Sequence, residues 1–375
     1  MDFGYDQDQE ALRDLARKML SDRATPRRLE EVEAGEERID RDLWAEMAAA
    51  GLLGVCIPEE FGGSGLGLVE LSVILEEVGR AVAPVPAWST LALGALPVAE
   101  FGSTAQKESL LPGVVRGDVI LSAALQEPGN YDPLSPVTTT ATAAEGGWRL
   151  DGVKVSVPAA AQATAIIVPA RVEGGVGLFL VEPGATGVSL EPTEMTNREI
   201  QYTLTLDGVE VAESAELGDL ARGREILDWL VQRASAGLCA MQVGVVDRAV
   251  RMTAEYTSSR EQFERPLAAF QAVSQRAANA YVDAESVKLT TMAAIWKLSE
   301  GLDATEEVAV AKFFAAEAAQ RAVHAAQHLH GGVGVDLSYP LHRYFIWAKQ
   351  IELTLGGGTQ QLLRLGEILA TEAVA

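Results

Sequence analysis

The alternation of apolar and polar residues changes twice along the chain and divides it into three parts. In residues 1–118, apolar side chains recur at intervals of three and four, for example over residues 12–20, which is the spacing of one helix face. A second helix is predicted over residues 42–50, with Gly51 as a left-handed cap. The first part is therefore predicted to be an N-terminal α-helical domain.

Residues 119–218 have a shorter period, close to two. Apolar residues alternate around two Asp-Gly pairs, Asp151-Gly152 and Asp207-Gly208, and such pairs are typical of hairpin turns. Short apolar runs at residues 165–169 and 177–181 fit further strands. This pattern predicts a small antiparallel β domain in the middle of the chain.

The helical period returns in residues 219–375. One long segment places apolar residues on a single face from Leu230 to Val245, and two further helical runs are predicted at about 268–299 and 305–329. The alanine-rich stretch Ala315–Gln327 is interpreted as a close-packed helix. Because polar breaks separate these runs, we expect a C-terminal four-helix-bundle domain.

Composition and charge exclude several classes of function. The 375 residues include 53 acidic and 30 basic ones, and the net charge of −23 argues against a nucleic-acid partner. No apolar run reaches ~18 residues and the acidic N-terminus is not a signal peptide, so we expect a cytoplasmic protein without a membrane span. Cys56 and Cys239 lie in apolar surroundings and are expected to be buried, reduced thiols.

Five motifs together resemble the acyl-CoA dehydrogenase family. YTSSREQFERPLAAFQAVSQ (Tyr256–Gln275) and HLHGGVG (His328–Gly334) resemble the flavin-cradling half of these proteins. GLLGVCIPEEFGGSGLG (Gly51–Gly67), LEEVGRAVAP (Leu75–Pro84) and ALQEPG (Ala124–Gly129) resemble the family's N-terminal signature, its following helix and its entry to the β domain. The resemblance extends over nearly the whole chain and implies an α+β fold with an N-terminal helical domain, a middle antiparallel β domain and a C-terminal helix bundle.

The catalytic base of the family is missing at the positions that match it. Desaturation of an acyl thioester needs a carboxylate to remove the α proton and a flavin to accept the β hydride. The resemblance places the base at Leu355 or Gly357, depending on the direction of counting, or at Ala234, which Ser235 follows. Glu352, the nearest carboxylate upstream of the loop, is interpreted as an ordinary helix charge. The resemblance therefore implies no catalytic residue in this chain.

In this family two subunits contribute to each FAD site, and the set that holds the flavin ring is poor here. Gln126 stands where a threonine is common, Asn130–Pro133 replaces a Gly-Ser-Asp turn, and Ser156–Pro158 replaces a Trp-x-Thr/Ser triplet. Pro158 also lacks a backbone N–H donor. We expect that the chain alone does not bind a flavin ring.

The set that reaches over to the FAD of a neighbouring subunit is better preserved. Arg260 matches the arginine that faces the pyrophosphate, where a planar guanidinium binds phosphate oxygens with two hydrogen bonds. Phe263 and Leu267 match its apolar neighbours, and Gln271 matches a polar contact. The resemblance implies that these four residues bind FAD, whereas the ordinary alternative for Arg260 is a surface ion pair.

A second FAD-contacting segment is implied around two glycines. Gly331 and Gly332 fit a close approach of backbone to cofactor, which only residues without a side chain allow. His328 replaces the glutamine that usually precedes them, and it completes the predicted FAD-binding residues. The ordinary alternative for the two glycines is a simple turn.

The four histidines of the chain fall within nineteen residues, a grouping that raises the question of a metal site. They are His324, His328, His330 and His342. No cysteine or carboxylate shares a ligand-like spacing with them, and flavin-dependent desaturation needs no metal. We expect no metal site.

These observations predict a subunit without a base that completes the FAD site of a homologous catalytic subunit. The resemblance is closest to actinobacterial α2β2 heterotetramers that desaturate bulky acyl-CoA thioesters such as steroid side chains. It implies that FAD is shared between the two subunits and that the acyl-CoA is bound mainly by the partner. Two alternatives stay open: a homotetrameric flavoprotein with different chemistry, and a flavin-free scaffold that binds acyl-CoA or another protein.

Overall fold

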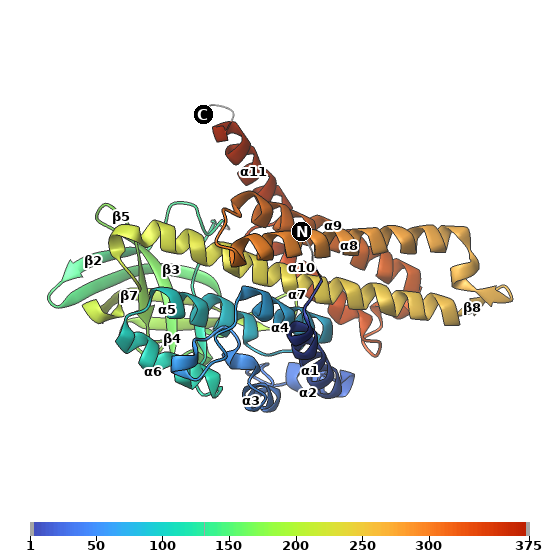
Figure 1. The fold of residues 1–375 in the computed structure, drawn as a ribbon, viewed down its shortest axis with the longest axis horizontal. Helices are drawn as coiled ribbons and strands as arrows, with labels where there is room; N and C mark the ends of the chain where they lie inside the picture. Colours follow the sequence, from blue (N-terminus) through green and yellow to red (C-terminus); the bar gives the residue numbers. More distant parts are fainter. Residues whose placement is uncertain (1–3, 131, 373–375) are drawn as a thin grey trace. The chain divides into compact units, whose positions relative to one another are not determined.

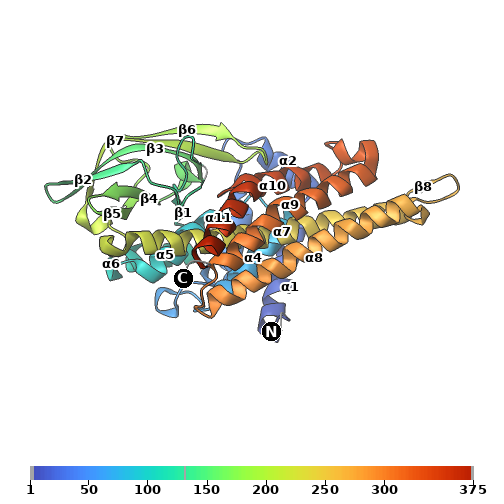
Figure 2. The same cartoon turned by 90° about the horizontal axis from the view of Figure 1, so that it is seen from above.

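The structure is a computed structural model that describes residues 4–130 and 132–372 (Figures 1 and 2). The N-terminal helices are α1 (Gln7–Arg23), α2 (Pro26–Glu33), α3 (Arg41–Ala49), α4 (Leu68–Ala81), a π-helix (Trp88–Ala95), α5 (Leu96–Phe101) and α6 (Thr104–Val115). The strands are β1 (Leu121–Ala123), β2 (Thr140–Ala144), β3 (Gly147–Pro158), β4 (Ala165–Val172), β5 (Gly175–Val181), β6 (Val188–Glu194) and β7 (Ile200–Ala212).

The C-terminal part is helical except for one short hairpin. It consists of α7 (Gly223–Ser259), the hairpin strands β8 (Glu261–Gln262) and β9 (Arg265–Pro266), α8 (Gln271–Ser299), α9 (Thr305–His330), α10 (Leu341–Leu353) and α11 (Gly358–Glu372). The predicted order of helices, strands and helices is thus confirmed, and the fold is α+β. The helices predicted at 268–299 and 305–329 correspond to α8 and α9, and the predicted cap Gly51 has a left-handed φ of 78°.

The chain forms two compact units by its internal contacts. The first contains the chain up to Glu31, Ser72–Ala83 and the residues from Ser235 onward, and the second contains Val32–Leu71 and Pro84–Ala234. Helices α4 and α7 each begin in the second unit and continue in the first. The finer division into residues 1–118, 119–218 and 219–375 stays a prediction.

The sheet of the second unit is mixed, whereas the sequence predicted an antiparallel one. Its strand order is β1-β4-β2-β3-β7-β6, with β5 paired to the other edge of β4. Most neighbours are antiparallel, but β1 and β2 both run parallel to β4. Pairing between strands far apart in the chain leaves no local signal, so alternation alone could not reveal these two parallel pairs.

The two Asp-Gly pairs are not hairpin turns, which corrects the prediction. Strand β3 continues through Asp151 and Gly152, strand β7 continues through Asp207 and Gly208, and the strands pair with a register shift between Leu150 and Gly152. The Asp151 side chain accepts a hydrogen bond from the Gly208 backbone N–H at 2.7 Å. The two pairs therefore form a β-bulge, which uses the same permissive glycine conformations as a tight turn.

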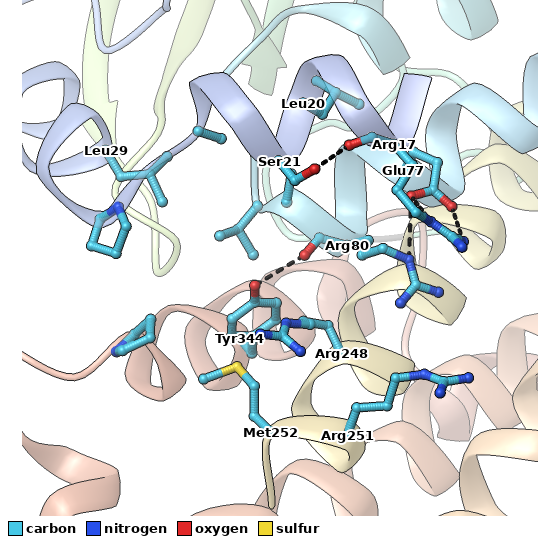
Figure 3. A pocket seen from close by; sticks show the side chains of 15 residues that line it. Arg17, Leu20, Ser21, Leu29, Glu77, Arg80, Arg248, Arg251, Met252 and Tyr344 are labelled. Atoms are coloured by element: carbon cyan, nitrogen blue, oxygen red, sulfur yellow. Dashed lines mark hydrogen bonds and ion pairs between the residues drawn. The ribbon is translucent and has the colours of Figure 1, made fainter. Parts of the chain in front are cut away.

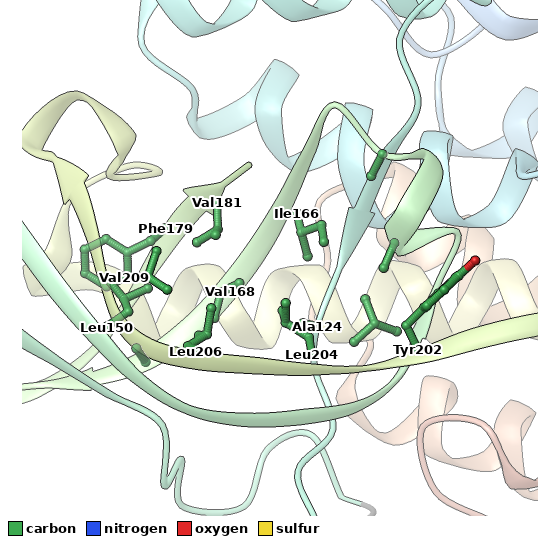
Figure 4. Close-up of a cluster of buried hydrophobic side chains, with 14 of the residues drawn as sticks. Ala124, Leu150, Ile166, Val168, Phe179, Val181, Tyr202, Leu204, Leu206 and Val209 are labelled. Atoms are coloured by element: carbon green, nitrogen blue, oxygen red, sulfur yellow. The ribbon is translucent and has the colours of Figure 1, made fainter. Parts of the chain in front are cut away.

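The core of the second unit lies inside the bent sheet. Figure 4 shows Leu150, Leu204 and Leu206 from β3 and β7 facing Ile166 and Phe179 from β4 and β5. All five side chains are at most 3% exposed. This burial stabilises the strands by roughly 1.5–3 kcal/mol for each large side chain.

The first unit is built on long helices that approach one another closely. The backbones of α4 and α7 meet where a Cβ atom on Gly79 would lie 2.0 Å from the Met241 carbonyl oxygen, and one on Gly244 would lie 1.9 Å from the Glu76 carbonyl oxygen. Only glycine fits at either position. The alanine-rich part of α9 is largely buried, which confirms the prediction of a close-packed helix.

Both cysteines are buried and unpaired, as predicted, and burial raises the pKa of Cys56 and of Cys239 to about 12. No helix within residues 4–130 and 132–372 is long and apolar enough to cross a membrane. The expected cytoplasmic location stays a prediction.

Candidate functional site

Arg260 begins the turn between α7 and α8. Its backbone N–H donates to the Tyr256 carbonyl at 2.8 Å, which ends α7, and its carbonyl accepts from the Leu267 N–H at 2.8 Å, which closes the β8–β9 hairpin. The side chain is exposed, and it forms no ion pair with any described residue. The alternative of an ordinary surface ion pair for Arg260 therefore finds no support within residues 4–130 and 132–372.

The hairpin between β8 and β9 presents an aromatic ring to solvent. Phe263 is 87% exposed, and both Phe263 and Glu264 have left-handed backbone conformations, with φ of 54° and 64°. A left-handed conformation costs free energy at a residue other than glycine. A large aromatic ring is also rarely as exposed as this one. The Phe263 ring makes an edge contact with Phe270 at 6.3 Å, and Arg265 stacks over Phe270 at 4.0 Å. The hairpin thus holds an apolar group in solvent.

Leu267 and Gln271 follow along the same turn. Leu267 is half-buried in a short 3-10 helix, Leu267–Ala269, and Gln271 is exposed as the first residue of α8. The four predicted residues from Arg260 to Gln271 therefore lie along the segment that joins the end of α7 to the start of α8.

The second predicted segment lies at the end of α9. Gly331 has φ 62° and ψ −138°, a conformation that side chains disfavour, and both Gly331 and Gly332 are exposed with no atom within 4 Å of where a Cβ would be. His328 is also exposed, one turn earlier in α9. The backbone of both glycines is open to another molecule.

A cluster of aromatic rings joins these two segments. His330, at the end of α9, stacks on Tyr256 of α7 at 4.4 Å, so the two predicted segments lie at the same end of the long helices. Its Nδ1 contacts the Ala326 carbonyl at 2.8 Å and its Nε2 contacts the Tyr339 hydroxyl at 3.2 Å. Burial lowers the pKa of His330, so the neutral ring donates at Nδ1 and accepts at Nε2. The spacing of the histidines raised only the question of a metal ligand at His330 and gave no sign of this positioning role.

The backbone is irregular around Ser156–Pro158, one of the segments that match the family's flavin-ring contacts. Ser156 and Ala159 have left-handed φ values of 53° and 49°, and the pairing of β3 with β7 shifts between Lys154 and Val157. Gln126 is buried, and its carbonyl accepts from the Val155 N–H at 2.9 Å. Of the segment 130–133, residue 131 lies outside the described residues.

None of the positions that match a catalytic base carries a carboxylate. Ala234 is fully buried, and its carbonyl accepts from the Trp88 indole at 3.0 Å. Ser235 is 4% exposed and Leu355 is 5% exposed, with a left-handed φ of 58°, while Gly357 is half-buried. None of these side chains can accept a proton from a carbon acid.

The turn between α10 and α11 is held by a buried lysine that sequence reasoning did not single out. The Lys312 ammonium, on α9, donates to the carbonyls of Ile351 at 3.0 Å, Glu352 at 2.9 Å and Gly356 at 3.0 Å. Lys312 is fully buried, and burial lowers its pKa to about 8. These three bonds satisfy carbonyls at the C-terminal end of α10 and fix the turn that contains Leu355.

Two carboxylates that the motifs single out have partners within the chain. The Glu352 side chain lies 2.6 Å from the Lys349 ammonium, in agreement with an ordinary helix charge. Glu127, in the ALQEPG motif, accepts from Lys154 at 2.7 Å and from the hydroxyls of Thr138 and Thr139. Burial alone would raise the pKa of Glu127, but these hydrogen bonds lower it to about 2. Glu127 therefore stays ionised and occupied, and it organises the sheet.

The histidines make aromatic and backbone contacts. His324 packs edge-on against Phe345 at 4.8 Å, and His342 Nδ1 contacts the Tyr339 carbonyl at 2.8 Å. Among residues 4–130 and 132–372, no three His, Cys, Asp or Glu side chains are grouped so that they could hold a metal ion.

The fold, a β domain between two helical parts, is that of the acyl-CoA dehydrogenase class. A family model for the acyl-CoA dehydrogenase N-terminal domain matches residues 6–118, and one for the C-terminal domain matches residues 221–370. The acyl-CoA dehydrogenase FadE27 of Mycobacterium tuberculosis is 37% identical over 99% of this chain and 99% of that protein. The chain belongs to the acyl-CoA dehydrogenase family, whose members are oxidoreductases that act on CH–CH bonds.

Two solved structures of complexes are similar over nearly their full length. A variant of the Tcur3481-Tcur3483 steroid ACAD has 45% sequence identity and a TM-score of 0.93, covering 98% of this chain and 99% of that chain. The ChsE4-ChsE5 complex from Mycobacterium tuberculosis has 37% identity and a TM-score of 0.94, covering 99% of each chain.

Proposed function

We propose that this chain is the base-lacking subunit of an FAD-dependent acyl-CoA dehydrogenase heterotetramer of α2β2 composition. One observation carries the proposal: the groups that reach toward a neighbour's cofactor are open, whereas the positions of the base are apolar and packed. Arg260 and the two glycines are exposed, while Ala234 and Leu355 are buried. The chain would therefore complete a cofactor site and leave the proton abstraction to its partner.

The open groups fit the cofactor that the family uses. An exposed guanidinium without a carboxylate partner among the described residues suits a pyrophosphate, and the space above Gly331 and Gly332 suits a close backbone approach. We propose that Arg260, Phe263, Leu267, Gln271, His328, Gly331 and Gly332 bind FAD. FAD, when bound, supplies the two-electron acceptor of the desaturation.

The partner is proposed to be a homologous catalytic subunit that carries the base and most of the acyl-CoA contacts. Support comes from the two similar solved structures, each of which pairs two proteins. An isolated subunit would leave Phe263, 87% exposed, in water, whereas a partner would cover it. We propose that one FAD is shared across this contact.

The substrate is proposed to be a bulky acyl-CoA thioester, of the steroid side-chain type. The support is the similarity to the Tcur3481-Tcur3483 steroid ACAD at 45% identity. Since the base and the flavin ring would lie in the partner, the substrate class is a property of the complex.

The test is a ferrocenium-coupled desaturation assay of this chain alone, of the partner alone and of the co-expressed pair. A positioned base contributes about 10²- to 10⁴-fold to such a reaction, so we expect the pair to turn over a steroid side-chain acyl-CoA and this chain alone to show no measurable rate. Turnover by this chain alone would refute the proposal. A co-expressed pair that is no more active than the partner alone would also refute it.

A further inference from the structure

A cavity of about 560 Å³ lies in the first compact unit, and none of the proposed FAD-binding residues lines it. Side chains from α1, α2, α4 and α7, with two residues at the start of α10, form its walls (Figure 3). Its volume falls in the range of about 300–1,000 Å³ that is typical of small-molecule sites. The proposed function makes no use of it.

Four arginines meet at this cavity, although the chain as a whole carries a net charge of −23. Arg17 comes from α1, Arg80 from α4, and Arg248 and Arg251 from α7, while Glu77 is the one carboxylate in the lining. Three helices thus bring cations to one cavity in a strongly acidic protein. Within the lining itself the arginines outnumber the carboxylates by four to one, while Glu76, Asp247 and Glu255 pair with them from outside the lining.

Three of these arginines, Arg17, Arg80 and Arg251, are paired with carboxylates of the chain. Glu77, whose side chain is 1% exposed, accepts from Arg17 at 3.0 Å and 2.6 Å and lies 3.3 Å from Arg80 Nε. Asp247 accepts from Arg80 and, at 2.8 Å, from Arg251. These carboxylates orient the guanidinium groups, and orientation before binding lowers the cost of binding an anion.

Arg248 has the weakest internal partner of the four. Its guanidinium lies 3.3 Å from Glu255, a side chain that is 67% exposed, and an exposed pair of this kind contributes little. The Tyr344 hydroxyl donates to the Arg80 carbonyl at 3.0 Å, and Arg248 lies beside Tyr344 at the cavity (Figure 3). Arg248 therefore has capacity for a ligand.

The remaining wall is apolar. Leu20, Leu29, Val82 and Met252 line the cavity, and each is at most 4% exposed. Figure 3 shows Leu29 on the side opposite the arginines. We propose that the cavity binds a small anionic amphiphile, with a carboxylate or phosphate group at Arg17, Arg80 and Arg248 and a short apolar body against these side chains.

Isothermal titration of the full-length chain tests the proposal with defined probes. Octanoate and octyl phosphate carry both parts of the ligand, acetate and inorganic phosphate carry only the charge, and octanol carries only the chain. We expect saturable one-site binding of at least one octyl anion, with binding at least about tenfold weaker for each of the single-part probes. A preference for octanoate or octyl phosphate would identify the head group and support the site.

Two variants assign the binding to this cavity. Arg248→Gln should lower the affinity for the octyl anion by about ten- to a hundred-fold, because it removes a charge-assisted hydrogen bond. The matched control is Arg27→Gln on α2, whose arginine is 89% exposed, pairs with Glu31 and does not line the cavity, and it should leave the affinity unchanged. Far-ultraviolet circular dichroism checks that both variants fold. Absence of saturable binding, equal binding of octanol, or equal loss in both variants would overturn the proposal.

Discussion

The two ends of the C-terminal helices differ in what their polar groups bind. At the end with the β8–β9 hairpin, Arg260, Gly331 and Gly332 face solvent, and no described residue pairs with the arginine. At the turn between α10 and α11, by contrast, the Lys312 ammonium satisfies three backbone carbonyls within the chain. We propose that another molecule completes the first end, whereas the polar groups of the second are satisfied within the chain.

Under the proposed function, this difference corresponds to the two halves of a composite site, of which the chain supplies one. A catalytic turn must present a carboxylate, whereas a turn fixed by Lys312 around the buried Leu355 only has to pack. The contacts of Lys312 thus stabilise the turn at which the proposed function places no catalytic residue. The exposed hairpin contributes little to the fold and is retained, we propose, for the contact with FAD in a partner.

The largest expected effect tests the closed end. Lys312→Met should lower the free energy of unfolding by about 3 kcal/mol, because three buried carbonyls lose their donor, although removal of a buried charge offsets part of the loss. The matched control is Lys349→Met, which removes a half-exposed lysine near the C-terminal end of α10. It should lower the free energy of unfolding by at most about 1 kcal/mol. Urea unfolding measures both changes. Equal effects of the two variants would show that Lys312 does not hold the turn.

The next effect tests the open end. Arg260→Ala should leave the unfolding free energy of the isolated chain within about 0.5 kcal/mol of wild type, because the side chain contacts little in the chain itself. In the assembled complex the same change should weaken FAD binding by about ten- to a hundred-fold, which corresponds to about 1.5–3 kcal/mol. Arg260→Lys should rescue only part of the loss, since an ammonium keeps the charge but not the two-pronged geometry.

An FAD titration of the apo-complex measures these affinities, with assembly checked by gel filtration. Because Arg260 is proposed to lie far from the reacting carbons, activity at saturating FAD should return to most of its wild-type value. Unchanged FAD affinity in an intact Arg260→Ala complex would remove the main support for a cofactor role of the hairpin.

A third effect concerns pH and the other internally satisfied site, around Glu127. The folded pKa of Glu127 is lowered to about 2 from 4.5, so its carboxylate stabilises the fold above pH 4.5, and this contribution is lost as the pH falls toward 2. The stability difference between wild type and Glu127→Gln, measured by urea unfolding, should therefore shrink as the pH falls through this window. A difference that does not change with pH would contradict the assigned hydrogen bonds.

Local sequence patterns predicted the elements better than the contacts between them. The helices α8 and α9 were predictable because their apolar faces are long and a polar break separates them. The Asp151-Gly152 pair was misread because a bulge and a tight turn use the same residues, and only the pairing of β3 with β7 distinguishes them. The parallel neighbours of β4 were missed because pairing between strands far apart in the chain leaves no local signal.

The candidate site likewise has residues that motifs predicted and residues that only the fold reveals. Motifs placed Arg260 and the glycines, which the structure brings to one end of the helices through the stacking of His330 on Tyr256. No motif pointed to Lys312, because a lysine in an alanine-rich helix gives no sign that three carbonyls will surround it. The arginine-lined cavity was equally hidden, since residues as distant as Arg17 and Arg248 meet only in the fold.

The most direct test of the central claim is the FAD content of this chain, purified alone and co-expressed with its proposed partner. Flavin absorbance is divided by protein concentration in each preparation. We predict a colourless or substoichiometric isolated chain and a yellow complex with about one FAD per heterodimer, because each chain supplies half of the contacts. Full flavin occupancy in the isolated chain would contradict the account and favour a homotetrameric flavoprotein.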